Sequence, residues 1–295
     1  MIYDIKLRFG YDYGGMAGAG RHLVRVMPLD LAGQQRLVAG LVTIDPRPDE
    51  RRDGWDFFGN HRVEFSFRTA HDSLDLVMQA RVDRQVPKPG EDISTAHAAL
   101  AADLGAWTDL GPDSPLHMMA ASPLVPIEPP TTRFARRLVK PGHSTLQVVR
   151  AVGRALHAHM TFDPHATEVD TPLAEAFAAR KGVCQDYSHI LIACLRGVGV
   201  PAGYVSGFLR TEPPPGKPRL EGADAMHAWV RAWCGARHGW VDYDPTNDCA
   251  VRNDHIVVAR GRDYADVAPI KGMLRVAGRQ NAHHAVDVIP VSGEG

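Results

Sequence analysis

The chain has 295 residues, enough for one large domain or two modest ones with a substantial buried core. Its hydrophobic fraction of 44% and charged fraction of 23% are those of an ordinary globular protein. The formal net charge of -1 gives no support to binding of nucleic acid or of an anionic membrane through bulk electrostatics, so we expect neither partner.

The N-terminal sequence does not read as a targeting segment. MIYDIKLRFGYDYGG lacks the basic stretch and the apolar run of a secretory signal. No stretch approaches the roughly 18 apolar residues that a bilayer-spanning helix needs. We therefore expect a cytoplasmic protein, and the sequence does not indicate an oligomeric state.

Residues 1–85 are predicted to form a β-rich N-terminal domain. Its candidate strands are short apolar or alternating segments separated by Gly, Pro and Asp, at residues 21–27, 36–44, 62–67 and 73–82. Strands at this spacing favour a small β-sandwich or barrel. Residues 14–20 are rich in glycine and are predicted to be a hairpin loop.

Residues 86–142 are proline-rich and are predicted to be a connecting segment, with one short helix near residues 96–106. Helical signals begin at Ser144, where Ser-Thr-Leu-Gln is a capping-box pattern followed by apolar residues at helical spacing. A second helix is predicted to open at Thr171-Pro172, and a third near Cys184.

Strands follow these helices. They are predicted at residues 202–209, 225–234, 239–243, 255–259 and 283–291. Helices first and antiparallel strands afterwards are typical of an α+β domain, which we assign to residues 143–295.

The four cysteines, Cys184, Cys194, Cys234 and Cys249, contain no C-x-x-C pair. This spacing disfavours a zinc ribbon or a thioredoxin-like redox site. In a reducing compartment a disulfide framework is also disfavoured, so each cysteine is first read as a small buried apolar residue.

Cys184 departs from that reading because of its neighbours. It comes just after a predicted turn at Gly182 and stands at the start of a predicted helix. A helix N-terminus lowers the pKa of a thiol there and offers unpaired N–H groups to an oxyanion. The sequence therefore makes Cys184 a candidate nucleophile, with a buried structural cysteine as the alternative.

A thiolate nucleophile needs a base and an orienting partner. His227 lies on a predicted strand, and a short loop leads from it to the next strand, which ends at Asp244 before Pro245. A hairpin would place the strand that carries His227 beside the strand that carries Asp244, but the exact cross-strand pairing cannot be read from the sequence. Spacing alone leaves Asp242 open as an alternative, and both His227 and Asp244 have ordinary structural readings, as a strand histidine and a turn former.

Another histidine cluster could suggest a metal. His157, His159 and His165 lie near Asp163, but the first two are two residues apart on a predicted helix and face different ways. We predict no metal ligand and no cofactor.

Several segments together resemble the transglutaminase-like superfamily. The nucleophile helix and following strand of that family resemble KGVCQDYSHILIACLRGVGVPAGYVSGFL, and its histidine and aspartate strands resemble DAMHAWVRAWCGARHGWVDYDPTND. DYADVAPIKG is similar to a segment downstream of the core in bacterial members. RHLVRVMPLD and DFFGNHRVEFSF are similar to the β-rich N-terminal region of bacterial members, so the resemblance covers most of the chain.

The resemblance implies a papain-like core behind a β-sandwich-like N-terminal domain. It also implies a catalytic triad of Cys184, His227 and Asp244, and it selects Asp244 over Asp242 because the family aspartate directly precedes Pro-Thr. The implied chemistry is thiol-dependent acyl transfer at the amide of a peptide or protein substrate. Hydrolysis of a peptide or isopeptide bond, as in a cysteine protease, is favoured over transfer to an amine.

Two further points depend on the family. Animal transglutaminases use calcium, but no D-x-[DN]-x-[DN]-G loop is present here, so we predict no calcium requirement. The alternative to an enzyme is a catalytically silent binding module that keeps the fold. Occupation of all three triad positions disfavours that alternative.

Overall fold

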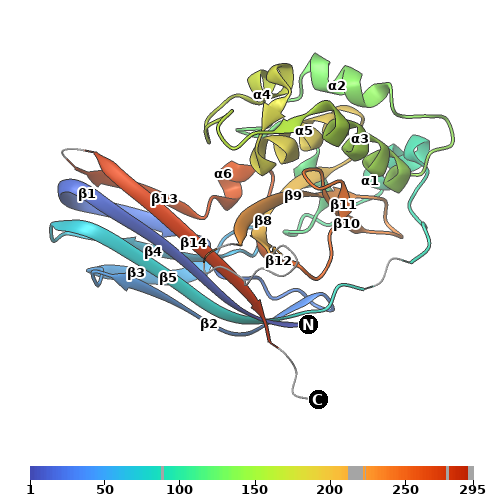
Figure 1. Ribbon diagram of the computed structural model, residues 1–295. Coiled ribbons are helices and arrows are strands. Elements are labelled where there is room, and N and C mark those ends of the chain that lie inside the picture. The colour runs from blue at the N-terminus through green and yellow to red at the C-terminus, as the bar shows by residue number, and fades with distance from the viewer. Residues whose placement is uncertain (88–89, 212–221, 223, 277–278, 292–295) are drawn as a thin grey trace, which may run out of the picture.

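The computed structural model describes residues 1–87, 90–211, 222, 224–276 and 279–291. It contains a curled N-terminal sheet and a second sheet covered by helices (Figure 1). The predicted α+β fold class is confirmed. Among the described residues, none of the helices has the length and apolar character needed to cross a bilayer.

The N-terminal sheet has seven strands: β1 (Ile2–Val24), β2 (Gln35–Asp45), β3 (Glu50–Trp55), β4 (His61–Ser66), β5 (His71–Arg84), β13 (Ile270–Arg275) and β14 (Gln280–Pro290). Its central strand is β1, which changes partners along its length. The first half of β1 pairs with β5 and β14, whereas the second half pairs with β4 and β13. This change of partners gives the sheet its curl.

The predicted hairpin loop at residues 14–20 is wrong, because β1 runs through it as one strand of 23 residues. The pairing register of β1 shifts in this segment, between Asp12 and Ala17 in its pairing with β5 and between Gly18 and Arg21 in its pairing with β13. Ala19 has a positive φ of 50°. Glycine inside a strand commonly marks a bulge, and here the bulged segment bends β1 between its two sets of partners.

The strand predicted at residues 283–291 as part of the second domain lies instead in the N-terminal sheet. Strand β14 pairs with β1 over eleven residue pairs, from Tyr3↔Pro290 to Tyr13↔Gln280. Figure 1 shows the red β14 beside the blue β1, with β13 also in this sheet. The alternation of a strand tells which side chains share a face, but not which strand lies beside it.

The connecting segment holds η1 (His97–Ala99), α1 (Leu100–Gly105), η2 (Pro115–Met118) and α2 (Pro129–Arg136). The helix predicted near residues 96–106 is therefore present as η1 and α1. Next come α3 (Thr145–His159), β6 (Thr161–Phe162), α4 (Leu173–Ala179), β7 (Lys181–Gly182) and α5 (Cys184–Gly197). The predicted capping box of α3 is confirmed, since Ser144 Oγ accepts from the N–H of Gln147 and the Gln147 amide oxygen accepts from the N–H of Ser144.

Helix α5 is the central helix of the second part. Its residues from Asp186 to Arg196 are buried, and α2, α3 and α4 pack against it. On its other side lies an antiparallel sheet in the order β11-β10-β9-β8-β12. These strands are β8 (Ala202–Leu209), β9 (Ala225–Trp233), β10 (Trp240–Asp244), β11 (Cys249–Ala250) and β12 (His255–Gly261), and the short helix α6 (Tyr264–Val267) follows.

The two parts are joined along β12, the edge strand of the second sheet. Gln35 bonds both backbone groups of Val257, with Nε2 2.7 Å from the carbonyl oxygen and Oε1 2.9 Å from the nitrogen. Asn60 does the same at Arg260, at 2.8 Å in both directions. Two amide side chains of the N-terminal part thus take the place of a further strand and cover a sheet edge that would otherwise be open.

We predict that replacing Gln35 by Leu destabilises the protein by about 2–6 kcal/mol, because the buried Val257 N–H and the Leu29 carbonyl lose their Gln35 partners, at about 1–3 kcal/mol each. Leucine keeps most of the volume. Chemical denaturation followed by circular dichroism measures the loss. The control is Gln79→Leu, the same change at an exposed position of β5, which we expect to stay within about 0.5 kcal/mol. Equal effects at both positions would contradict this role of Gln35.

Candidate active site

Cys184 is the first residue of α5 and is partly exposed. The turn before it is fixed by Asp186, whose Oδ2 accepts from the N–H of Val183 at 2.8 Å and from Thr167 Oγ1 at 2.6 Å. A Cβ at Gly182 would lie 2.5 Å from the same oxygen, so only glycine leaves room for this bond. Asp186 therefore caps the start of α5, and the local sequence holds Cys184 at the helix start.

The position of Cys184 gives it two kinds of polar support. Helix α5 has 14 residues, so the aligned peptide dipoles place partial positive charge at its N-terminus. The N–H of Cys184 belongs to the first turn, where the helix itself supplies no acceptor. It is therefore a candidate donor to an oxyanion formed at the sulfur.

His227 on β9 and Asp244 at the end of β10 lie together, as the hairpin prediction required. His227 Nε2 is 2.8 Å from Asp244 Oδ2. The side chain of Asp242 has a different partner: its Oδ2 accepts from the indole N–H of Trp229 at 3.3 Å. The structure therefore brings Asp244, rather than Asp242, to the imidazole.

Asp244 is completely buried and accepts five hydrogen bonds. His227 Nε2, His255 Nε2 and Asn247 Nδ2 approach its Oδ2 at 2.8, 3.2 and 2.7 Å. The backbone N–H groups of Thr246 and Asn247 donate to its Oδ1 at 2.9 and 3.2 Å. Burial acts to raise the pKa of Asp244, but these donors hold it well below its usual range. Asp244 is therefore a carboxylate at every ordinary pH.

Two neighbouring groups, Asp244 and Cys184, act on the imidazole of His227. Burial alone would lower the pKa of His227, but its bond to Asp244 and the charge of the adjacent Cys184 raise it to about 10. The imidazole is therefore protonated at neutral pH when the thiol is ionised. An imidazolium between a thiolate and a carboxylate is the resting state from which a thiolate nucleophile acts.

The sequence alone did not single out two of the residues on Asp244. Asn247 lies three residues after Asp244, in the turn that follows Pro245, and no sequence motif marked it as a partner of Asp244. His255 begins β12, and its approach to Asp244 depends on how β12 is placed in the sheet. A predicted strand at residues 255–259 held the only signal for His255.

Two tyrosines also border the nucleophile. Burial, together with the negative charge of Cys184, raises the pKa of Tyr264 on α6 and of Tyr204 on β8. Their rings lie 6.1 Å apart. The backbone N–H of Tyr264 donates to His189 Nε2, on α5, at 3.2 Å, which ties α6 to the helix that carries Cys184.

Among the described residues, one group could hold a metal ion: His227, Asp244 and His255, with ligand atoms within 4.8 Å of one another. A metal there would replace the Nε2–H bonds to Asp244, so metal binding and the Asp244–His227 pair exclude each other. The histidines considered from sequence do not gather. His157 Nδ1 contacts the carbonyl of Pro245, and the ring of His159 packs against Phe134 and Phe177.

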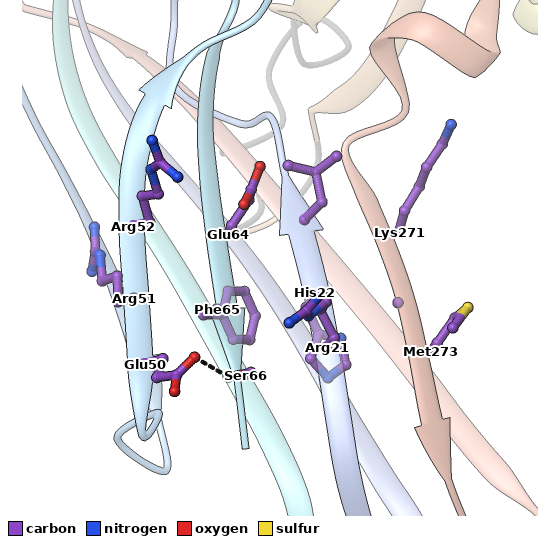
Figure 2. A pocket seen from close by; sticks show the side chains of 12 residues that line it. Arg21, His22, Glu50, Arg51, Arg52, Glu64, Phe65, Ser66, Lys271 and Met273 are labelled. Atoms are coloured by element: carbon purple, nitrogen blue, oxygen red, sulfur yellow. Dashed lines mark hydrogen bonds between the residues drawn. The ribbon is translucent and has the colours of Figure 1, made fainter. Parts of the chain in front are cut away.

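A separate hollow of about 800 Å³ lies on the N-terminal sheet, and its lining includes neither Cys184, His227 nor Asp244. Figure 2 shows its side chains on neighbouring strands β3, β4, β1 and β13. Basic residues outnumber acidic ones there, with Arg21, Arg51, Arg52 and Lys271 against Glu50 and Glu64. It holds no cysteine, and we do not assign the chemistry to it.

Family comparisons agree with this architecture. Residues 132–245 match the transglutaminase-like superfamily, and residues 3–83 match the bacterial transglutaminase-like N-terminal region. The chain belongs to the transglutaminase-like superfamily.

Its relatives include an uncharacterised protein of Mycobacterium tuberculosis, 36% identical over 270 residues, which are 88% of this chain and 84% of the relative. An uncharacterised protein of Mycobacterium leprae is 28% identical over 285 residues, 95% of each chain. A crystal structure from Cytophaga hutchinsonii, named a "putative cysteine protease", has a TM-score of 0.71 at 18% identity. That similarity covers 99% of this chain and 92% of the other, and it shows a shared fold.

We predict that iodoacetamide at pH 7 labels Cys184 first. Burial raises the pKa of Cys234 to about 12 and of Cys249 to about 11, and it raises that of Cys194 as well. A thiol with a pKa of 11 or more is ionised to only about one part in 10⁴ at pH 7, so we expect Cys184 to react at least ~100-fold faster. Peptide mapping by mass spectrometry gives the four rates.

Unfolded protein in urea is the control for this measurement, because there all four thiols become equivalent. Slow and equal labelling of the four cysteines in the folded protein would contradict the assignment of Cys184 as the reactive thiol.

Proposed function

We propose that this protein is a cysteine enzyme that transfers the acyl group of a peptide or isopeptide amide, most readily to water. Cys184 is the nucleophile, His227 the general acid and base, and Asp244 the carboxylate that orients the imidazole. The observation that carries the proposal is the position of His227, which is bonded to buried Asp244 at 2.8 Å and lies next to Cys184 at the start of α5.

The first half of the reaction forms a thioester. The Cys184 thiolate attacks the carbonyl carbon, and the C=O electron pair moves onto oxygen, where the N–H of Cys184 donates to the oxyanion. As the oxyanion collapses, the C–N bond breaks and His227 gives its proton to the leaving amine. The free amine departs, and the acyl group stays on sulfur.

The second half releases the acyl group. His227, now neutral, takes a proton from water while the water oxygen attacks the thioester carbon. The C–S bond then breaks, giving a carboxylic acid and the original pair of thiolate and imidazolium. An amine in place of water gives a new amide by the same steps, so the triad alone does not choose between hydrolysis and transamidation.

Two considerations favour hydrolysis of a peptide or isopeptide bond. The name of the Cytophaga hutchinsonii protein is that of a cysteine protease, and its fold is shared along almost the whole chain. Water also needs no second binding site. We propose no metal or organic cofactor for these steps, and we place the reaction in the cytoplasm.

A catalytically silent binding module is the second candidate function. The pairing of His227 with Asp244 argues against a binding module, because a binding role requires neither a protonated His227 nor a buried Asp244.

We predict that the protein cleaves members of a peptide library and that Cys184→Ala abolishes cleavage. Asp244→Asn is expected to lower kcat by about 10²–10⁴, because the amide no longer fixes the useful imidazole tautomer. Asp242→Asn is the matched control: it is two residues away on β10, bonds Trp229 and does not touch His227, so we expect near wild-type rates. Mass spectrometry of the products measures all four proteins.

The same library with an added primary amine separates the two reactions. Acid products in the presence of amine support hydrolysis, and amide products support transamidation. Cleavage that survives Cys184→Ala, or wild-type protein that binds peptides without ever modifying them, would overturn the proposal.

A further inference from the structure

His255 is a second buried imidazole on the carboxylate of the proposed triad. It is the first residue of β12 and is only 5% exposed. Its Nε2 lies 3.2 Å from Asp244 Oδ2, the same oxygen that bonds His227 Nε2. The two imidazole ring centres are 6.1 Å apart. Asp244 is therefore held between two histidines from two different strands.

The contacts of His255 assign its protons. The backbone N–H of Arg252 points to Nδ1 at 3.4 Å, and the N–H of His255 in turn donates to the Arg252 carbonyl at 3.1 Å. An Nδ1 that accepts a hydrogen bond carries no proton, so the proton of the neutral ring is on Nε2 and is donated to Asp244. His255 thus supplies Asp244 with a hydrogen bond through Nε2.

The ring of His255 is also fixed by packing. It meets the fully buried Trp229 edge to face, with ring centres 5.2 Å apart and planes at 84°. Trp229 can lie there because residue 207 is glycine: a Cβ at Gly207 would come within 2.4 Å of the indole. A ring held in this way cannot turn its Nε2 away from Asp244 without displacing the indole.

The backbone of His255 is held by the N-terminal part of the chain. Arg84, at the end of β5 and almost fully buried, donates from Nε to the His255 carbonyl at 2.9 Å. Two residues further along β12, Gln35 fixes both backbone groups of Val257. The N-terminal sheet therefore sets where β12, and with it His255, lies relative to Asp244.

We propose that His255 is a positioning residue that fixes the Asp244 carboxylate, and that Arg84 couples the N-terminal sheet to this task. The proposal rests on the function proposed above. Asn247 Nδ2 also donates to Oδ2, at 2.7 Å, from the turn after β10, and His255 adds a donor from a different element, β12. A donor whose ring is held by packing opposes rotation of the carboxylate, which would carry the imidazole away from Cys184, and small misplacements of reacting groups can lower a rate by about 100-fold.

The test uses the full-length protein with three substitutions. His255→Phe keeps an aromatic ring against Trp229 but removes the donor, and His255→Gln restores an N–H near the position of Nε2. His71→Phe is the matched control, a buried histidine packed on Phe67 in the N-terminal sheet. The readout is the rate of Cys184 alkylation by iodoacetamide at pH 6 and at pH 10.

Iodoacetamide reacts with a thiolate, which an imidazolium beside the sulfur stabilises, whereas at pH 10 an ordinary thiol is ionised without that help. We expect His255→Phe to lower the pH 6 rate at least tenfold and to leave the pH 10 rate unchanged. His255→Gln is expected to recover most of the pH 6 rate, and His71→Phe to behave as wild type. Equal losses at both pH values, or a His255→Phe profile identical to wild type, would overturn the proposal.

A second measurement keeps the two proposals apart. In protein labelled with ¹⁵N-histidine, NMR detects the Nε2–H protons of His227 and His255 directly, whatever the reactivity of Cys184. Wild-type Cys184 that is inert at pH 6 contradicts the proposed function, and the His227 signal still decides the role of His255. We expect His255→Phe to expose the His227 proton to exchange with water. A wild-type spectrum that changes on addition of EDTA would replace positioning by metal ligation and overturn the inference.

Discussion

A carboxylate without any exposed surface is the constraint around which the second half of this protein is arranged. Burial of an unpaired charge is prohibitively unfavourable, so Asp244 requires donors from every side. They come from β9, from the turn after β10 and from β12. One side chain, Asp244, therefore depends on the strand order of the sheet, on the turn sequence and on the position of the edge strand.

The same carboxylate sets the electrostatic state of the site. Asp244 stays negative because five hydrogen bonds stabilise its charge. That charge in turn raises the pKa of His227. Burial raises the pKa values of the other three thiols, Cys194, Cys234 and Cys249, so these thiols stay protonated at neutral pH. A thiol at the start of α5, next to the imidazole, is thus set apart by its surroundings rather than by its intrinsic chemistry.

Local sequence patterns made much of the second part of the fold and of the candidate site predictable. The capping box at Ser144, the glycine turn before Cys184 and the hairpin that joins His227 to Asp244 each span few residues, so the sequence carries their signals directly. Pairings between distant segments were not predictable. The contact of His255 with Asp244 requires β12 to lie beyond β8, and the place of β14 requires it to cross to β1. Alternation specifies a face and leaves the neighbour open.

The return of β13 and β14 to β1 has a consequence for biosynthesis. During translation the first strands leave the ribosome more than 200 residues before their last partners do, so β1 has open edges while most of the protein is still being made. Pairings this far apart in sequence are slow to form. The nascent chain therefore needs protection against association through β1 until its final strand is released, and a truncation near the end of the gene would damage the first strand that is synthesised.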